Sequence, residues 1–123
     1  MKSYQELLIW QKARELTKLT YEISSQLPQK EQYGLTSQIN RCAVSVPSNI
    51  AEGWSRNSTK DFINFLYISR GSLAELETQI IISHDLGYIN DDYLMRMQEK
   101  FADLGKMLST TISKLKEKQA LIC

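Results

Sequence analysis

A chain of 123 residues is long enough for one domain, and its 42% of hydrophobic residues is enough to bury a core. Fifteen lysines and arginines balance fourteen acidic residues, and this net charge of +1 excludes a strongly basic nucleic-acid arm and an acidic tail. The single His84 and the two cysteines, Cys42 and Cys123, are too few for a zinc site, which takes three or four clustered ligands. We expect one domain over residues 1–123, without a metal.

The sequence predicts four helices, because apolar residues recur every three or four positions along four long stretches. The first helix covers residues 5–27 and stops at a proline, which cannot continue the helical hydrogen bonds. The second covers residues 31–54, with Gly53 as its terminator. Pro47 lies inside this helix, where it removes a backbone donor and clashes with the carbonyl of Ala43. We therefore expect a kink in the second helix at Pro47.

The third helix covers residues 59–86, where Ser58 can cap the first turn and Gly87 supplies the left-handed residue that ends the helix. The fourth covers residues 91–118 and is capped by Asn90. Short connections force neighbouring helices to run antiparallel. The prediction is an all-α protein, an antiparallel up-down-up-down four-helix bundle with a Pro-kinked second helix.

The third helix is apolar around more of its circumference than a single buried face requires. One such stretch covers residues 62–68 and another covers residues 80–82. A helix that is apolar on several sides is buried on several sides, whereas each helix of an isolated four-helix bundle keeps a solvent face. The surplus predicts a subunit interface. The alternative is a few scattered exposed apolar residues, which are common.

The patterns of catalysis are missing. A di-iron site in a four-helix bundle uses Glu-x-x-His, but Ile81 stands three positions before His84. Nothing in the sequence brings Cys42 or a serine to His84 as a nucleophilic pair, and there is no glycine-rich phosphate loop. We predict a protein that is not an enzyme and has no cofactor or small-molecule substrate.

A polar face runs along the second helix. Its members recur at spacings of four and three residues, within an arc of about 80°. They are Arg41, Ser45, Asn49, Glu52 and Arg56, and Glu75 of the third helix is grouped with them as a candidate interface residue. Aligned charged and amide groups of this kind can bind a ligand, a phosphate or a partner subunit. The alternatives are a solvated outer face, or a salt-bridge network in which Arg41 or Arg56 pairs with Glu52 or with the Glu75 and Glu77 pair of the third helix.

Lysines gather near the end of the fourth helix, at Lys106, Lys114, Lys116 and Lys118. Cations at a helix C-terminus are the ordinary complement of the helix dipole, so one subunit would bind nucleic acid feebly. In a symmetric ring the cluster repeats in every copy, and electrostatic affinity grows with the number of phosphates neutralised. A ring could therefore bind nucleic acid usefully.

The N-terminal residues lack the charged and apolar regions of a signal peptide, and no stretch approaches the roughly 18 apolar residues of a membrane span. Two lone cysteines fit free thiols in a reducing compartment. We expect a cytoplasmic protein that makes no membrane contact.

Four segments, in this order along the chain, resemble one protein family. They are LIWQKA at 8–13, YGLTSQINRCAVSVPSNIAEG at 33–53, GSLAELETQ at 71–79 and LGYI at 86–89. The similarity is to the four-helix-bundle proteins encoded in intervening sequences of bacterial 23S ribosomal RNA genes, a family historically labelled as ribosomal protein. Asn40, where the family commonly has Arg, slightly weakens any argument for a basic face.

The resemblance implies an up-down bundle that assembles as a homo-oligomer, typically a pentameric ring. A more distant relative, the accessory protein of diversity-generating retroelements, is a basic pentamer that works with a reverse transcriptase and nucleic acid. Within the matching segments, Ala43, Ala51 and Gly71 are small enough to let helices approach closely.

Two functions are therefore predicted. The first is a homo-oligomer, a pentamer by the resemblance, that binds RNA through the lysines at positions 106, 114, 116 and 118. The alternative is a protein-interaction scaffold or accessory protein, such as a reverse transcriptase partner, that docks on the polar face of the second helix and does not bind nucleic acid directly.

Overall fold

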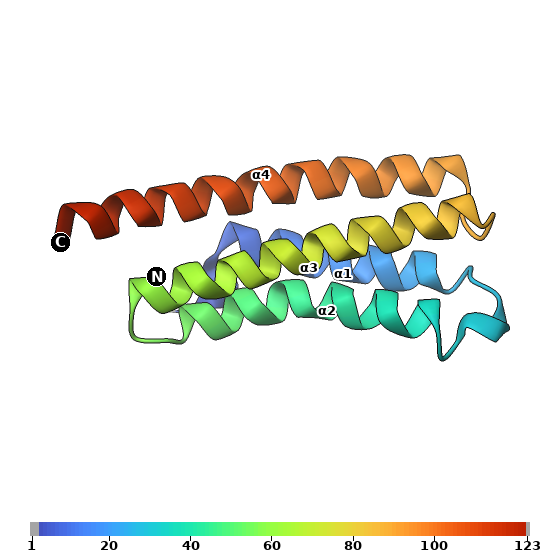
Figure 1. Ribbon diagram of the computed structural model, residues 1–123, viewed down its shortest axis with the longest axis horizontal. Helices are drawn as coiled ribbons and strands as arrows, with labels where there is room; N and C mark the ends of the chain where they lie inside the picture. The colour runs from blue at the N-terminus through green and yellow to red at the C-terminus, as the bar shows by residue number, and fades with distance from the viewer. Residues whose placement is uncertain (1–2, 123) are drawn as a thin grey trace.

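A computed structural model describes residues 3–122, and over this range the chain forms four long helices and no β-strand. The helices are α1 (Leu8–Ser24), α2 (Leu35–Trp54), α3 (Thr59–Asp85) and α4 (Asp91–Ile122), with two short 3-10 helices, η1 (Tyr4–Glu6) and η2 (Gln29–Glu31). They lie side by side as a bundle (Figure 1), which confirms the all-α four-helix fold. Within the described range, no helix is long and apolar enough to cross a membrane.

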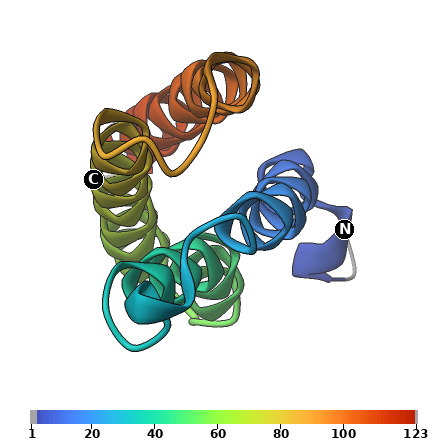
Figure 2. The ribbon, with the colours of Figure 1, turned by 90° about the vertical axis from the view of Figure 1, so that its right-hand side faces the viewer.

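The connections lie alternately at the two ends of the bundle, so each helix runs opposite to the one before it (Figure 1). The start of α1 and the end of α4 lie at the same end, and the last turns of α4 extend beyond the other helices. Viewed along the bundle, α1 and α4 are the two ends of an open arc (Figure 2). Among the pairs of long helices that touch, α1 and α4 pack least closely, and α2 and α3 pack most extensively.

The first two helices are shorter than predicted. The first starts at Leu8 rather than at residue 5, because Leu7 has an extended backbone (φ −71°, ψ 127°) that separates α1 from η1. It ends at Ser24, before the predicted residue 27. The second starts at Leu35 rather than at residue 31, because Gly34 lies outside the helical region of φ and ψ. These termini are set by local backbone conformation, which the spacing of apolar residues does not predict.

The third and fourth helices start where their caps predict. The Oγ of Ser58 accepts a hydrogen bond from the N–H of Asp61 at 3.1 Å, and the Oδ1 of Asn90 accepts one from the N–H of Tyr93 at 2.9 Å. Gly87 has a φ of 80°, the left-handed conformation that ends α3 at little cost for glycine. The fourth helix continues to Ile122, four residues beyond the predicted end.

The core lies where the apolar stripes of the four helices meet. Its fully buried side chains come from every long helix and include Leu16, Ile23, Ile39, Ile50, Leu66, Leu76, Ile80, Met97 and Leu108. Burial of one such side chain stabilises the fold by about 1.5–3 kcal/mol. The common core therefore holds the helices together and fixes which face of each one remains at the surface.

A cross-helix hydrogen bond compensates for Pro47 inside α2. Proline has no N–H, so the carbonyl of Ala43 cannot accept the usual helical bond from residue 47. The hydroxyl of Thr17 on α1 lies 3.0 Å from that carbonyl and also 3.0 Å from the carbonyl of Ala13. It can therefore donate to the freed carbonyl and tie α1 to α2. The kink expected at Pro47 stays a prediction.

Close approach of α2 and α3 depends on Gly53, which was predicted to terminate the second helix. A Cβ at this position would lie 2.6 Å from the Cβ of Phe65 and 3.0 Å from the Cδ1 of Phe62, so only glycine fits. Gly71 was predicted to permit close approach on the third helix, and this was wrong. It is exposed, and a Cβ there would have no neighbour within 4 Å.

Candidate functional site

The polar face predicted on the second helix borders a groove between α2 and α3, which we call the α2/α3 groove. Its volume is about 520 Å³. It is lined by Tyr33, Ser37, Gln38, Arg41, Cys42, Ser45, Ser72, Glu75 and Gln79. The structure therefore brings together three of the predicted residues, Arg41, Ser45 and Glu75. Asn49 supports the groove from one turn further along α2.

Hydroxyl and amide groups fasten the two walls of this groove together. The Nδ2 of Asn49 donates to the carbonyl of Ser45 at 2.8 Å and lies 2.9 Å from its Oγ. That Oγ lies 2.8 Å from the Oγ of Ser72 on α3. Ser45 therefore joins α2 to α3 directly, and Asn49 contacts the Ser45 hydroxyl from within α2.

Cys42 lies in the floor of the α2/α3 groove as a protonated thiol. Its Sγ donates to the carbonyl of Ser72 at 3.0 Å and lies 3.9 Å from the Oε2 of Glu75. Burial, together with the negative charge of Glu75, raises the pKa of the thiol to about 11. The reactive form of cysteine is the thiolate, so this side chain is a poor nucleophile near neutral pH.

Arg41 and Glu75 place opposite charges on the two walls of the groove without a salt bridge. Both side chains are exposed, and neither forms an ion pair within 4.0 Å among the residues that the structure describes. The Oε1 of Gln79 is buried without a hydrogen-bond partner. The groove thus offers a cation and an anion to a binding partner, whereas the Gln79 acceptor is out of a partner's reach.

Glu52 and Arg56 are separate from this groove. The Nε of Arg56 lies 3.7 Å from the Oε2 of Glu52, in an i,i+4 pair with both side chains about half exposed. Exposed pairs of this type contribute about 0.3–0.5 kcal/mol. The predicted polar face therefore divides in two: the salt-bridge alternative describes Glu52 and Arg56, and the binding alternative fits Arg41.

The four lysines predicted to contact nucleic acid do not form one cluster. At about 100° per residue, Lys106, Lys114 and Lys118 fall within an arc of about 120°, whereas Lys116 points to another side. The Nζ of Lys116 lies 5.1 Å from the ring centroid of Tyr67 on α3. We call the other three the α4 lysine face; none forms an ion pair within 4.0 Å in the described part of the chain.

Lys106 also borders a groove of about 320 Å³ between α1 and α4, on the open side of the bundle. Its charged lining is mixed and consists of Lys12, Glu15, Lys100, Asp103 and Lys106. The Nζ of Lys12 lies 3.6 Å from the Oε2 of Glu15, so part of this charge is neutralised locally. The basic character of α4 is therefore clearest beyond this groove, in its last turns.

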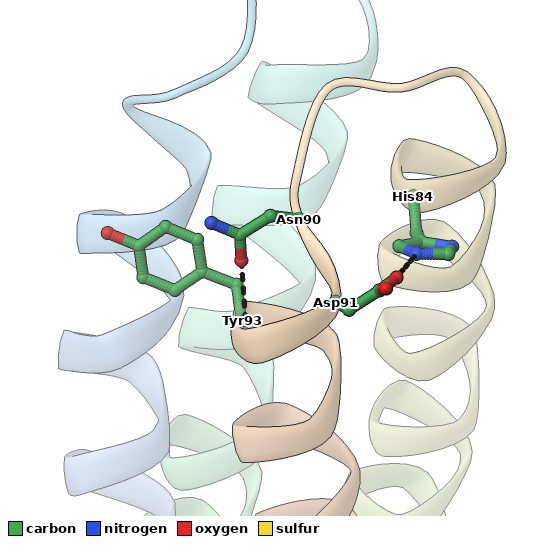
Figure 3. A network of polar contacts seen from close by, with 4 residues as sticks. All are labelled: His84, Asn90, Asp91 and Tyr93. Atoms are coloured by element: carbon green, nitrogen blue, oxygen red, sulfur yellow. Dashed lines mark hydrogen bonds and ion pairs between the residues drawn. The ribbon is translucent and has the colours of Figure 1, made fainter.

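His84 joins the end of α3 to the start of α4. Its Nε2 lies 2.6 Å from the Oδ1 of Asp91, next to the cap made by Asn90 (Figure 3). His84 stands nine residues after Glu75, about 14 Å along the helix axis, so it is remote from Cys42. Among the described residues, no group of three or more His, Cys, Asp and Glu side chains is placed to hold a metal ion.

Several residues of the α2/α3 groove were missed in the sequence, although a signal for them was present. Gln38 precedes Arg41 by three positions and so continues the predicted polar face. Ser72 and Gln79 stand three positions before and four positions after the predicted Glu75 on α3, so they repeat the same spacing. The sequence contains both stripes but does not say that they face each other.

Fold and site together define a small four-helix bundle protein with a polar interhelical groove. A family model described as "23S rRNA-intervening sequence protein" matches residues 5–110, and the chain belongs to this family.

A solved structure from Bacteroides thetaiotaomicron, described as a protein with unknown function from the S23 ribosomal protein family, has a TM-score of 0.79 and 23% identity. The match covers 85% of this chain and 98% of that chain. At this identity the likeness shows the fold. No curated protein matches the chain.

Proposed function

We propose that this protein is a non-enzymatic homo-oligomer, a pentameric ring, that binds RNA through the α4 lysine face. The observation that carries the proposal is the positive charge of one segment of α4, in a chain whose net charge is only +1. Residues 104–118 contain four lysines and one glutamate. Three of the lysines lie within about 120° around α4, and two of them, Lys114 and Lys118, stand in its last turns. The end of α4 extends beyond the other helices (Figure 1). The family name, which refers to ribosomal RNA intervening sequences, supports RNA as the partner.

Exposed apolar side chains on α3 support assembly. Ile68, Ile82 and Leu86 are 50%, 42% and 55% exposed, and their spacing places them within about 40° of one another around the helix. Ser72, Glu75 and Gln79 of the α2/α3 groove lie between them on the same face. Half-exposed apolar side chains that share one helix face are surface that a neighbouring subunit would cover.

A ring requires each subunit to meet its neighbours through two different surfaces. A substitution on one face of α3 therefore changes only one of these two surfaces. We expect Ile68→Glu to dissociate the oligomer, measured as mass by light scattering. Ala74→Glu introduces the same charge at an exposed position on another side of α3 and should leave the mass unchanged. A monomeric wild-type protein would refute the assembly.

RNA binding is tested by fluorescence anisotropy with a structured RNA at about 50 mM salt, where electrostatic affinity is strong. Each phosphate contact contributes about −0.9 to the slope of log affinity against log salt on a duplex. The double variant Lys114→Gln/Lys118→Gln should bind more weakly and with a shallower slope. Lys30→Gln, which removes an exposed lysine on η2, is the matched control. Failure of the wild-type protein to bind at low salt would refute the proposal.

Catalysis has no part in this proposal. The one buried thiol of the described residues is protonated near neutral pH, and His84 contacts Asp91 near the end of the bundle, remote from this thiol. What remains at the surface is charge and apolar area, and these support binding and assembly.

The second candidate function is a protein-interaction scaffold, which the unpaired charges of the α2/α3 groove favour. A protein partner seated in the groove would contact Arg41 and Glu75, which are both exposed. Arg41→Ala should then abolish capture of a defined partner without changing the oligomer mass. Glu52→Ala, which removes a charge paired locally with Arg56, should leave capture intact. Equal capture by both variants would exclude the groove as the docking site.

A further inference from the structure

A third groove lies between η1, α1 and α2, and we call it the aromatic groove. Its volume is about 490 Å³. Among the residues that line it are Tyr4, Trp10, Arg14, Lys18, Val44 and Pro47. Neither predicted function uses it. This groove contains both aromatic rings and cations, and no carboxylate lies in its described lining. The α2/α3 and α1/α4 grooves both contain carboxylates.

Local hydrogen bonds hold the aromatic wall in place. The Oγ of Ser3 accepts from the N–H of Gln5 at 3.0 Å, and the side chain of Gln11 on α1 donates to the carbonyl of Gln5 at 2.9 Å. These bonds fold η1 back against α1. As a result, the rings of Tyr4 and Trp10 meet edge to face, with centroids 5.3 Å apart and an interplanar angle of 69°.

The aromatic wall is accessible. Both rings are only partly buried, and Val44 on the opposite wall is 41% exposed. Pro47 adds a flat apolar surface to α2 that carries no N–H. A planar apolar group, such as a nucleobase, can therefore enter between these walls.

The charges of the aromatic groove have one sign. Arg14 and Lys18 are both exposed and stand one helical turn apart, about 6 Å along α1. Neither forms an ion pair within 4.0 Å among the described residues, and the described lining contains no Asp or Glu. By contrast, Glu15 and Asp103 line the α1/α4 groove, and Glu75 faces Arg41 in the α2/α3 groove. Charge complementarity therefore selects an anionic occupant here.

Arg14 connects the aromatic and the cationic parts of the groove. Its Cζ lies 5.6 Å from the ring centroid of Trp10, in a cation–π arrangement. A base stacked on the aromatic wall would place its own phosphate near this guanidinium. The next phosphate along the strand would lie toward Lys18.

We propose that the aromatic groove binds single-stranded RNA, with a base against Trp10 and Tyr4 and successive phosphates on Arg14 and Lys18. Base stacking on aromatic side chains beside a basic groove is the general mode of single-strand binding. The bases of a duplex are already stacked on one another and are not available. The inference rests on the proposed RNA binding and adds a contact at the end of the bundle where the α4 lysine face also lies (Figure 1).

The fluorescence of Trp10 tests the proposal without altering the groove. Trp54→Phe removes the other tryptophan and keeps an aromatic ring beside Phe62, whose centroid lies 6.0 Å away. An unstructured RNA strand of about 12 nucleotides, within the usual site size, should quench Trp10 emission in a saturable manner. A duplex of the same sequence should leave the emission unchanged. Binding of the strand by anisotropy without quenching would overturn the proposal.

Variants then separate the contribution of base stacking to the RNA affinity from that of the positive charges. Trp10→Leu should weaken single-strand binding about 5- to 150-fold, the effect of losing one stacked base, with helix content checked by circular dichroism. Arg14→Gln and Lys18→Gln should each reduce the magnitude of the salt slope by about 0.7. Lys30→Gln should change neither quantity.

The outcomes separate this proposal from the proposed function. If the wild-type protein binds no RNA at low salt, both fail. If binding depends on Lys114 and Lys118 but not on the aromatic groove, only this inference fails. If Trp10→Leu alters the oligomer mass and leaves RNA affinity unchanged, the groove is a contact between copies of the chain, and this also overturns the inference.

Discussion

The second and fourth helices are fixed in the bundle in different ways. On one side of α2, the hydroxyl of Thr17 reaches the carbonyl of Ala43 at 3.0 Å. On its other side, the buried Ser69 donates to the carbonyl of Val46 at 2.8 Å, and Ser45 meets Ser72. Both flanks of α2 are therefore joined to neighbours by polar bonds as well as by apolar packing.

The fourth helix depends more on its apolar stripe. Along its length, Arg70 of α3 donates to the Oγ of Ser109 at 3.2 Å and lies beside Tyr67, as does Lys116. At its start, Asp91 meets His84. Its contact with α1 is the loosest in the bundle. The tightly fixed helix therefore borders two defined grooves, whereas the loosely held helix carries the α4 lysine face, whose lysines form no ion pair within 4.0 Å in the described part of the chain.

We expect the largest loss of stability from a substitution that disrupts the close contact between α2 and α3. Gly53→Ala should lower the free energy of unfolding by about 1–3 kcal/mol, because the new methyl group overlaps Phe65 and the helices must separate. Gly71→Ala is the control, since it has open space and should raise stability by about 0.5–1 kcal/mol through helix propensity. Urea unfolding measures both. Equal changes in the two variants would show that close approach at position 53 does not matter.

The next effect tests the bond between Thr17 and the carbonyl that Pro47 leaves free. Thr17→Val should cost about 1 kcal/mol, because it removes the donor and keeps the shape. In a Pro47→Ala background the cost should shrink, since the restored N–H can serve Ala43. A double-mutant cycle of urea unfolding measures this coupling. Strictly additive changes would contradict the compensating role of Thr17.

A smaller effect compares the two helices directly. Ser69→Ala should lower stability by about 0.5–1.5 kcal/mol, because its hydroxyl is fully buried and bonded to α2. Ser109→Ala removes a hydroxyl at the partly exposed contact of α4 and should stay within about 0.5 kcal/mol. A larger loss from the α4 variant would reverse the comparison.

The smallest effect appears only at alkaline pH. The unfolded Cys42 thiol ionises near its ordinary pKa of 9.0, whereas burial raises the folded pKa to about 11. Its contribution to stability is therefore fully present below about pH 8 and is lost as pH rises toward 11. Unfolding across this range should show the loss, and Cys42→Ala should reduce it. Tyr88 has a pKa raised from 10.0 by its hydrogen bond to Glu31, so Tyr88→Phe belongs in the background of both proteins.

Much of the fold could be predicted because its signals are local. The caps at Ser58 and Asn90 and the positive φ of Gly87 act within one turn of the chain, and all three hold. The first two helices differ from the prediction at their starts. There the backbones of Leu7 and Gly34 leave the helical conformation.

The candidate site could be predicted only in part. The polar stripe of α2 was identified, but the same stripe contains Arg41, which is unpaired in a groove, and Arg56, which is paired with Glu52. Lys116 was grouped with the other lysines although it lies over Tyr67. The Arg56–Glu52 pair is local and was among the predicted alternatives. The groove beside Arg41 and the contact of Lys116 with Tyr67 depend on α3, which lies elsewhere in the chain, so a run of residues does not reveal them.

By itself the sequence determined four helices, their order and their polar and apolar faces, because periodicity and capping act within a few residues. The resemblance of four of its segments also indicated the family. The tertiary structure decided which faces meet. Side chains far apart in the chain had to be brought together before Thr17 could serve Ala43, before Gly53 could become a point of close approach, and before Trp10 and Arg14 could line a groove with Val44. Those meetings depend on how the helices rotate to bury a common core, which no single helix specifies.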